Sequence, residues 1–415
     1  MVNNKIIQRL IGAGLVFLSI IQITAICFAL EDSDFLIHGF LGQGYILSDD
    51  NNYLGDSNRG TWEFNEVGLN LTVPLLDDLR FGVQFFSRDM GFYADNELEV
   101  DWAFFDYRYS DWLGLRAGKI KMPYGLYNRQ RDADNLRTSI LLPQSVYPEG
   151  LREFVVAHQG VSIYGSYPLG MVGEVDYEGF IGTLNTSTSN PLLSNMFQMI
   201  GYELASRGID YQTIMIQNGI SLDEIDTRII QIIGGNLIWL TPISGFKIGY
   251  TQIQGEGELV AAGQKAVLEL PFIRVVSVEY EIGDLVLMAE HFEMEAKLDM
   301  SFLLEGFEAD VNMEGWYTGA AYHIATWLDL GASYSEYYPL AEDKNGSLIE
   351  SVGGKDYYAW QKDTTLSVKF NFNEYLSLKF ETHFINGVGL CSLNENSGTM
   401  EENWMLYVIK TSLNF

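Results

Sequence analysis

The residues most able to do chemistry in this chain are six basic side chains within positions 119–152. They are Lys119, Lys121, Arg129, Arg131, Arg137 and Arg152. Only three acidic residues lie in this segment, although the whole chain has 55 Asp and Glu against 25 Lys and Arg. Because a guanidinium can donate two parallel hydrogen bonds to a carboxylate or a phosphate, the segment predicts a place where small anions are attracted and bound.

A second interpretation of these side chains requires no solute. Arg129 and Arg131 could be neutralised by Asp132 and Asp134 in a rigid loop, and the last two arginines of the segment could clamp that loop to an acidic wall. Both roles would stabilise the protein without selecting ions. The sequence alone leaves the two interpretations open.

Other kinds of chemistry find little support. The five histidines are not spaced like metal ligands, and we expect no metal and no cofactor. Ser162 near His158 is the one pair that suggests a hydrolytic site, but no nucleophile motif surrounds it. A pI near 4.4 argues against nucleic-acid binding. We therefore expect that the protein is not an enzyme.

The elements that position the basic segment repeat with a period of two, which is typical of strands. Ser377, Lys379, Glu381 and His383, for example, alternate with apolar neighbours. The pattern predicts sixteen strands, at residues 35–47, 60–73, 79–89, 98–109, 113–122, 159–167, 171–183, 229–240, 245–254, 271–282, 284–294, 314–324, 328–338, 357–372, 375–386 and 403–415.

The connections between these strands alternate between tight turns and long loops, as in bacterial outer-membrane barrels. We predict an all-β fold: one transmembrane antiparallel barrel over residues 30–415, with both termini at the short-turn, periplasmic end. The basic segment falls in the third long connection, 123–158. Strand parity points Arg80, Arg88 and Arg116 into the lumen. By the same parity Lys119 and Lys121 face lipid, where they could bind lipopolysaccharide phosphates.

The two ends of the chain carry export signals. Residues 1–29 combine Lys5 and Arg9 with an uncharged apolar stretch and end in Ala29, as a secretory signal peptide does. At the other end, Phe415 closes a row of alternating residues. This row is similar to the last strand by which the barrel-assembly machinery recognises outer-membrane proteins.

The stretch Gly118-Lys119-Ile120-Lys121-Met122-Pro123-Tyr124-Gly125-Leu126-Tyr127-Asn128, with Leu142-Pro143-Gln144-Ser145-Val146-Tyr147 after it, resembles the bacterial porin superfamily. The resemblance is to porin-like proteins related to the phosphate-selective group. It implies that the third loop folds into the barrel and narrows it, and that the protein forms a trimer. It also implies passive diffusion of small hydrophilic solutes such as phosphate or other anions. The acidic third-loop motif of cation-preferring porins is missing.

Two alternatives remain for the function. The 45-residue connection 184–228, in which residues 192–206 predict a helix, favours a non-channel surface protein, an adhesin or a receptor, that acts through its loops. The acidic bulk of the chain favours a pore that prefers cations, if the acids of the long loops dominate its mouth.

Overall fold

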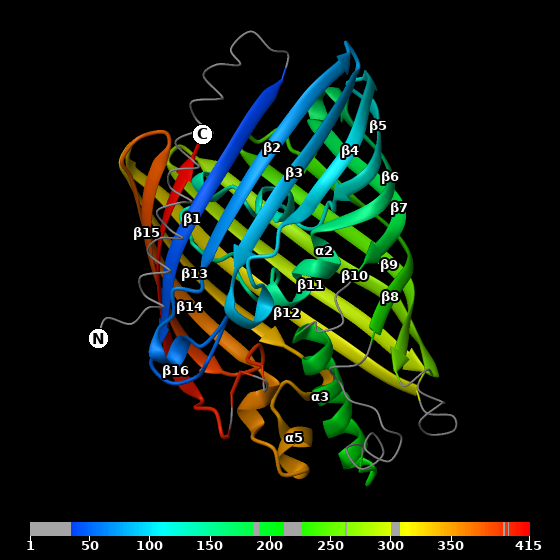
Figure 1. Ribbon diagram of the computed structural model, residues 1–415, viewed down its shortest axis with the longest axis vertical. Helices are drawn as coiled ribbons and strands as arrows, with labels where there is room; N and C mark the ends of the chain where they lie inside the picture. Colours follow the sequence, from blue (N-terminus) through cyan, green and yellow to red (C-terminus); the bar gives the residue numbers. More distant parts are fainter. Residues whose placement is uncertain are drawn as a thin grey trace, which may run out of the picture.

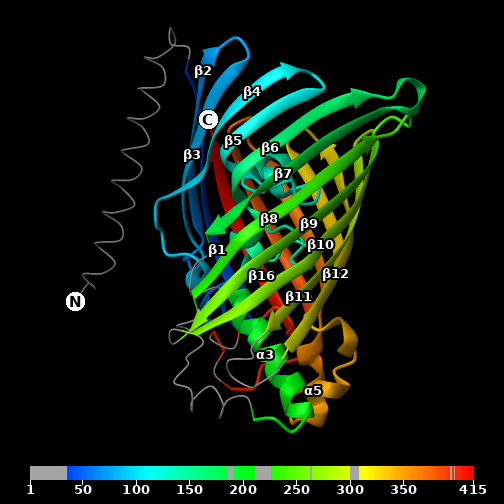
Figure 2. The same ribbon diagram turned by 90° about the vertical axis from the view of Figure 1, so that its right-hand side faces the viewer.

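The computed structural model describes residues 35–185, 191–210, 226–261, 264–299, 308–392, 395–396 and 398–415. Its strands form one closed barrel in which each strand pairs with its neighbours along the chain and β16 pairs with β1. Every pairing is antiparallel. Figures 1 and 2 show the strands tilted around the barrel wall. Closure leaves no unpaired strand edge.

The strands are β1 (Leu36–Ser48), β2 (Asn65–Leu76), β3 (Leu79–Asp89), β4 (Glu99–Ser110), β5 (Leu113–Lys121), β6 (Ala157–Pro168), β7 (Glu174–Asn185), β8 (Asp226–Leu240), β9 (Phe246–Ala261), β10 (Gln264–Ile282), β11 (Leu285–Asp299), β12 (Glu308–Ala325), β13 (Leu328–Tyr338), β14 (Gln361–Asn371), β15 (Leu376–Gly387) and β16 (Asn403–Asn414). The helices are α2 (Arg152–Val155), α3 (Pro191–Ser206) and α5 (Ser347–Ser351). Short 3-10 turns are η1 (Ser57–Arg59), η2 (Gly91–Tyr93), η3 (Asn128–Gln130), η4 (Asp134–Leu136), η5 (Glu149–Leu151), η6 (Gly170–Val172), η8 (Ala341–Asp343) and η9 (Asp356–Ala359).

The predicted barrel and each of its sixteen strands are confirmed, and several strand boundaries are corrected. The strands predicted at 60–73 and 357–372 begin only at Asn65 and Gln361. Within the connections predicted at 255–270 and 295–313, all the described residues are strand: 255–261, 264–270, 295–299 and 308–313. The signal peptide predicted at 1–29 lies outside the described residues and stays a prediction.

The long strands β9–β12 were underestimated because their polarity is inverted toward the loop end. In β11, buried apolar side chains alternate there with charged ones, whereas the prediction looked for polar residues facing in. The buried members are Phe292, Met294, Ala296 and Leu298, and the charged members are Glu293, Glu295 and Lys297. The apolar face therefore points into the barrel, and the charged face points out.

The inner wall of β14 and β15 has the opposite character. Its buried inward side chains include Asp363, Lys369, Lys379, Glu381 and His383. Leu366 and Phe380 alternate with them and are exposed on the outer surface. One side of the lumen is thus apolar near the loop end, and the other is ionic.

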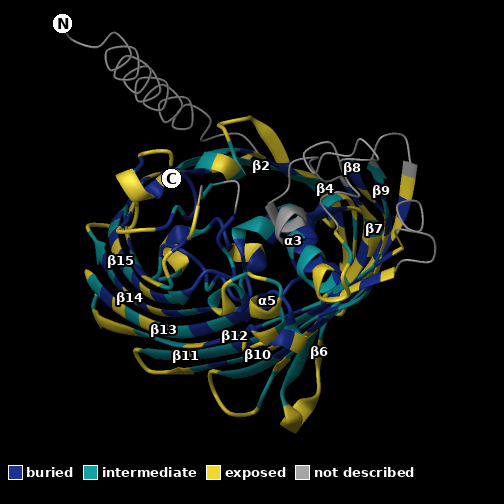
Figure 3. Cartoon of the chain, turned by 90° about the horizontal axis from the view of Figure 1, so that it is seen from below, coloured by how far each residue is buried: buried dark blue, intermediate teal, exposed yellow. Residues whose placement is uncertain are grey.

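The helix predicted at 192–206 is confirmed as α3, which begins at Pro191. Pro suits the first turn of a helix because its missing N–H has no partner there anyway. Phe197, Ile200 and Leu204 of α3 are buried in the same apolar cluster as the inner faces of β8–β12. Figure 3, viewed from the loop end, shows α3 and α5 lying across the barrel opening. None of the described helices is both long and apolar enough to span a bilayer.

Candidate functional site

The third long connection, residues 122–156, lies inside the barrel. Its two ends are tied together by Asn128, whose Nδ2 donates to the carbonyl oxygens of Met122 (3.0 Å) and Val155 (2.6 Å). Gly125 adopts a φ of 55° and packs so closely on Tyr147 that a Cβ would lie 2.2 Å from the tyrosine Oη. These contacts within the loop fix its shape independently of its contacts with the barrel wall.

One side of the loop docks on the β9–β12 wall around Glu290. This buried carboxylate accepts hydrogen bonds from the hydroxyls of Tyr147 (2.6 Å), Tyr317 (2.8 Å) and Ser277 (2.6 Å), and from the backbone N–H of Leu126 (3.0 Å). Apolar side chains of the loop and of these strands form one continuous core around it. Two further wall residues bind the loop beside it: Glu279 accepts the Tyr127 hydroxyl, and Thr251 Oγ1 accepts the Gly125 N–H at 3.1 Å. Glu290 is therefore the centre of a small polar cluster within a largely apolar face.

The other side of the loop docks on β14–β16 through charges. Glu381 accepts the backbone N–H groups of Ile140 (2.6 Å) and Leu141 (3.0 Å). Lys379 Nζ donates to the carbonyl oxygens of Asp134 (2.6 Å) and Ser139 (2.9 Å). Lys410 Nζ lies 2.5 Å from Asp134 Oδ2. On this face, therefore, several charged side chains together hold the loop.

Four of the predicted site arginines are held by carboxylates within the loop region. Arg88 and Arg131 both pair with Glu149, at 2.6 and 3.0 Å. Arg137 pairs with Asp134 at 2.6 Å, and Arg152 with Asp132 at 2.9 Å. Such pairs are what the stabilising interpretation expects for Arg131, Arg137 and Arg152, although Arg131 pairs with Glu149 rather than with an adjacent aspartate. Arg88 was predicted only as a lumen residue, and it pairs with the same Glu149.

Glu149 shows how strongly these pairs are coupled. Burial alone would raise the pKa of its carboxyl, but Arg131, Arg88 and Arg152 outweigh burial and lower the pKa to about 2. The pKa of Asp132 is also held well below its usual value, because Lys121 and Arg152 outweigh its burial. The carboxyls of Glu149 and Asp132 are therefore ionised at neutral pH.

The orientation predicted for Lys121 is wrong. Its Nζ lies 2.7 Å from Asp132 and 3.7 Å from Asp101, both inside the barrel, because β5 ends at Lys121 and the chain turns inward there. Lys119 Nζ instead donates to the exposed carbonyl of Val100 at 2.6 Å. The two lysines thus separate, and Lys121 alone joins the loop network.

Three arginines form a different group, at the side of the lumen bounded by β3–β7. Arg80 pairs with Asp106 at 2.6 Å, and Arg116 lies between Asp106 (3.6 Å) and Glu178 (2.9 Å). Arg129, from the loop, also pairs with Glu178. The side chains of Arg80 and Arg129 are 58% and 43% exposed, whereas that of Arg131 is 2% exposed. We call Arg80, Arg116 and Arg129 the arginine triad.

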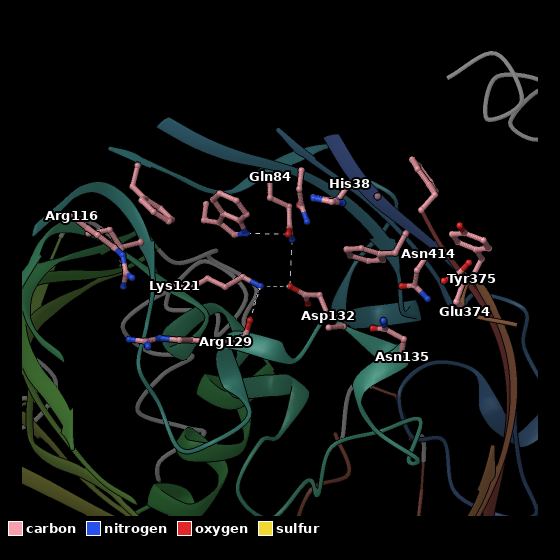
Figure 4. Close-up of a pocket in the computed structure, with 18 residues that line it drawn as sticks. His38, Gln84, Arg116, Lys121, Arg129, Asp132, Asn135, Glu374, Tyr375 and Asn414 are labelled. Atoms are coloured by element: carbon pink, nitrogen blue, oxygen red, sulfur yellow. Dashed lines mark hydrogen bonds and ion pairs between the residues drawn. The ribbon is translucent and has the colours of Figure 1, made fainter. Parts of the chain in front are cut away.

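The triad borders two cavities that lie between the loop and the wall. A cavity of about 590 Å³ is lined by Arg116, Lys121 and Arg129 together with Asp132 and residues of β1–β4. In Figure 4, Arg116 and Arg129 stand at one end of it, and Tyr375 and Asn414 stand at the other. A second cavity of about 520 Å³ contains all three triad residues and reaches the turns at the short-turn end.

Three carboxylates on the strands are residues of the candidate site that the sequence interpretation missed. Glu178, Glu290 and Asp106 were not singled out, although each shares the inward parity of its strand. That parity is the signal that would have found them. Within the described residues, no three His, Cys, Asp or Glu side chains stand close enough to hold a metal ion. Ser162 Oγ and both ring nitrogens of His158 lack hydrogen-bond partners there, so no nucleophile–base pair is formed.

Barrel and inward loop together define the class: this is the porin-type fold of bacterial outer-membrane channels. OmpF of Salmonella typhi, solved with daunomycin, aligns with a TM-score of 0.55 at 13% identity over 92% of this chain and 97% of that one. OprB of Pseudomonas putida aligns at 0.53 and 12%, covering 94% and 96%. An anion-selective porin from Comamonas acidovorans aligns at 0.51 and 12%, covering 92% and 99%. No protein-family model matches the sequence, and no curated protein matches it.

Proposed function

We propose that the protein is an outer-membrane porin through which small hydrophilic solutes diffuse, and that the arginine triad makes the passage prefer anions. The exposure of Arg80 and Arg129, which both line the 520 Å³ cavity, carries this proposal. Charges in a narrow passage between low-dielectric walls are poorly screened, so guanidiniums there lower the barrier for anions. The proposed constriction is the segment 122–156.

The remaining predicted site residues take different parts in this proposal. Lys121 contributes its charge at the 590 Å³ cavity. The three loop arginines Arg131, Arg137 and Arg152 hold the loop in place together with Arg88. Lys119 remains a candidate contact for lipopolysaccharide. Export would use the signal peptide at 1–29, and insertion would use the strand that ends in Phe415. A homotrimer is proposed because one similar structure, OmpT of Vibrio cholerae, is described as a trimer form.

Single-channel conductance in a planar bilayer, with the reversal potential under a KCl gradient, tests the proposal. We expect an anion-selective reversal that shifts toward zero when Arg80→Ala and Arg129→Ala are combined. Lys362→Ala, on the outer face of β14, is the matched control and leaves the reversal potential unchanged. A cation-selective reversal would keep the pore and overturn the role of the triad.

The surface-protein alternative has its own structural support. α3 lies across the opening with Phe197, Ile200 and Leu204 buried, which leaves less room for a solute at the loop end. A correctly folded barrel that carries no current would favour a receptor or adhesin over a pore.

A further inference from the structure

Four inward side chains form a row across neighbouring strands at one level of the lumen. His38 in β1 is paired with Asn70 in β2, Asn70 with Gln84 in β3, and Gln84 with Trp102 in β4. All four line the cavity of about 590 Å³. The row therefore presents an imidazole, two amides and an indole to the same space.

Trp102 is held in a defined position in this row. Its Nε1 donates to Gln84 Oε1 at 3.0 Å, and Gln84 Nε2 donates in turn to Asp101 at 2.9 Å. The indole lies over Gly82, where a Cβ would come within 2.9 Å of the ring. The glycine thus leaves the space that the ring occupies, and the hydrogen bonds fix its orientation.

A second ring and the cations complete the cavity. The ring of Phe104 lies 5.3 Å from that of Trp102, centroid to centroid, with 37° between their planes. The Arg116 guanidinium lies 5.7 Å from the Phe104 centroid. Among the described residues, Asn70 Oδ1 is a buried polar atom without a hydrogen-bond partner, and Asn70 lines the cavity. Arg116 also lines it, although its Nε lies 3.6 Å from Asp106 Oδ2.

These groups match the three parts of a charged sugar. The apolar face of a pyranose ring packs on flat aromatic side chains, hydroxyl groups need amide and imidazole partners, and guanidiniums bind phosphate or carboxylate. An inorganic anion would use only the arginines, and a neutral sugar would leave them unused. The cavity volume falls in the range usual for small-molecule sites.

We propose that this cavity is a binding site for sugars that carry an anionic group, with Trp102 as the platform for the ring. The proposal names a solute class for the pore suggested above and rests on that function only for the passage of the bound solute through the barrel. Binding itself does not require that the barrel conducts. The site is therefore testable in the folded, detergent-solubilised protein.

The experiment is calorimetric titration of the full barrel with glucose 6-phosphate, glucose and inorganic phosphate. We expect glucose 6-phosphate to bind roughly tenfold tighter than phosphate, the scale of one aromatic contact. Trp102→Ala should remove that advantage while phosphate binding stays unchanged, and Trp102→Phe should retain most of it. Trp327→Ala, at an exposed turn, is the control and should behave as the unmodified protein.

The outcomes separate this site from the pore. Equal affinities for glucose 6-phosphate and phosphate in the unmodified protein overturn the ring platform, whatever the conductance. Loss of both affinities in Trp102→Ala and in Trp102→Phe also overturns it, because the indole would then be structural. A barrel that shows the expected titrations but carries no current overturns the pore and leaves the site standing.

Discussion

The β9–β12 and β14–β16 faces of the barrel both hold the loop, but with different kinds of contact. On β9–β12 the loop is packed into an apolar core around one carboxylate, Glu290. On β14–β16 it is held by Lys379, Lys410 and Glu381, which contact Asp134 and the nearby backbone. On the first face Glu290 accepts four hydrogen bonds, and only the contacts of Glu279 and Thr251 lie beside it. Loss of this one carboxylate should therefore cost the most there. The second distributes them, so it should tolerate a single loss.

The largest effect is expected from Glu290→Ala. Glu290 is 3% exposed, and its removal leaves three hydroxyls without their acceptor. The Leu126 N–H loses one of its two acceptors and keeps the Tyr147 hydroxyl. Each unpaired buried donor is costly, so we expect a destabilisation of roughly 3–5 kcal/mol and a mobile loop. Unfolding by denaturant and the noise of the single-channel current measure the two consequences.

Glu293→Ala provides the control, because Glu293 lies on the same strand with its side chain 44% exposed. It should change stability by less than about 0.5 kcal/mol. If Glu290→Ala were as stable as this control, the apolar core and the contacts of Glu279 and Thr251 would be enough to hold the loop, and the contrast between the two faces would fail.

A smaller effect is expected from Lys379→Met on the ionic face. Lys379 is fully buried, but Asp134 keeps Lys410 and Arg137 when it is lost. We expect about 1–3 kcal/mol of destabilisation, since two backbone carbonyls lose a donor. Equilibrium unfolding should show the loss, with Lys362→Met on the outer face as the comparison. A loss larger than that of Glu290→Ala would reverse the proposed order of the two faces.

Acid should loosen the loop only at low pH. A carboxyl whose pKa is lowered on docking contributes stability that is complete above its undocked pKa and is lost as the pH falls toward the docked one. For Glu149 these values are about 4.5 and about 2. Single-channel noise should therefore be constant from pH 7 down to about 5 and should rise below about 4.5. Loosening between pH 7 and 6 would contradict the assignment of Glu149 as a clamp.

Period-two patterning was enough to predict the barrel, because lipid outside and polar groups inside leave an alternation that survives in short segments such as 376–384. The same rule failed in β9–β12, where Phe292, Met294 and Leu298 face inward and charges face out. There the inner wall packs against α3 and the loop. The alternation of apolar and polar residues shows which face of a strand is apolar. It does not show whether that face contacts lipid or packs against other parts of the protein.

The candidate site was predicted only in part for a related reason. The basic residues of 119–152 could be counted from the sequence, but their partners, Glu149 within the segment and Glu178 on a distant strand, follow from the folded path of the loop. Exposure then divides residues that look alike in sequence. Arg129 and Arg131 are two positions apart, yet one opens to the lumen and the other is enclosed.

The difference in exposure between Arg129 and Arg131 gives the sharpest test of ion selectivity. Arg129→Ala is also the substitution with the smallest expected effect on stability. Arg129→Ala removes a partly exposed pair with Glu178, so we expect at most about 1 kcal/mol of destabilisation. Its reversal potential under a KCl gradient should move toward zero, because a charge that faces the passage is lost. Arg131→Ala leaves Glu149 buried with Arg88 alone and should destabilise more. Its reversal potential should change less as long as the loop stays docked. If Arg131→Ala shifted the selectivity and Arg129→Ala did not, the passage would lie on the other side of the loop, between the loop and the ionic wall of β14–β16.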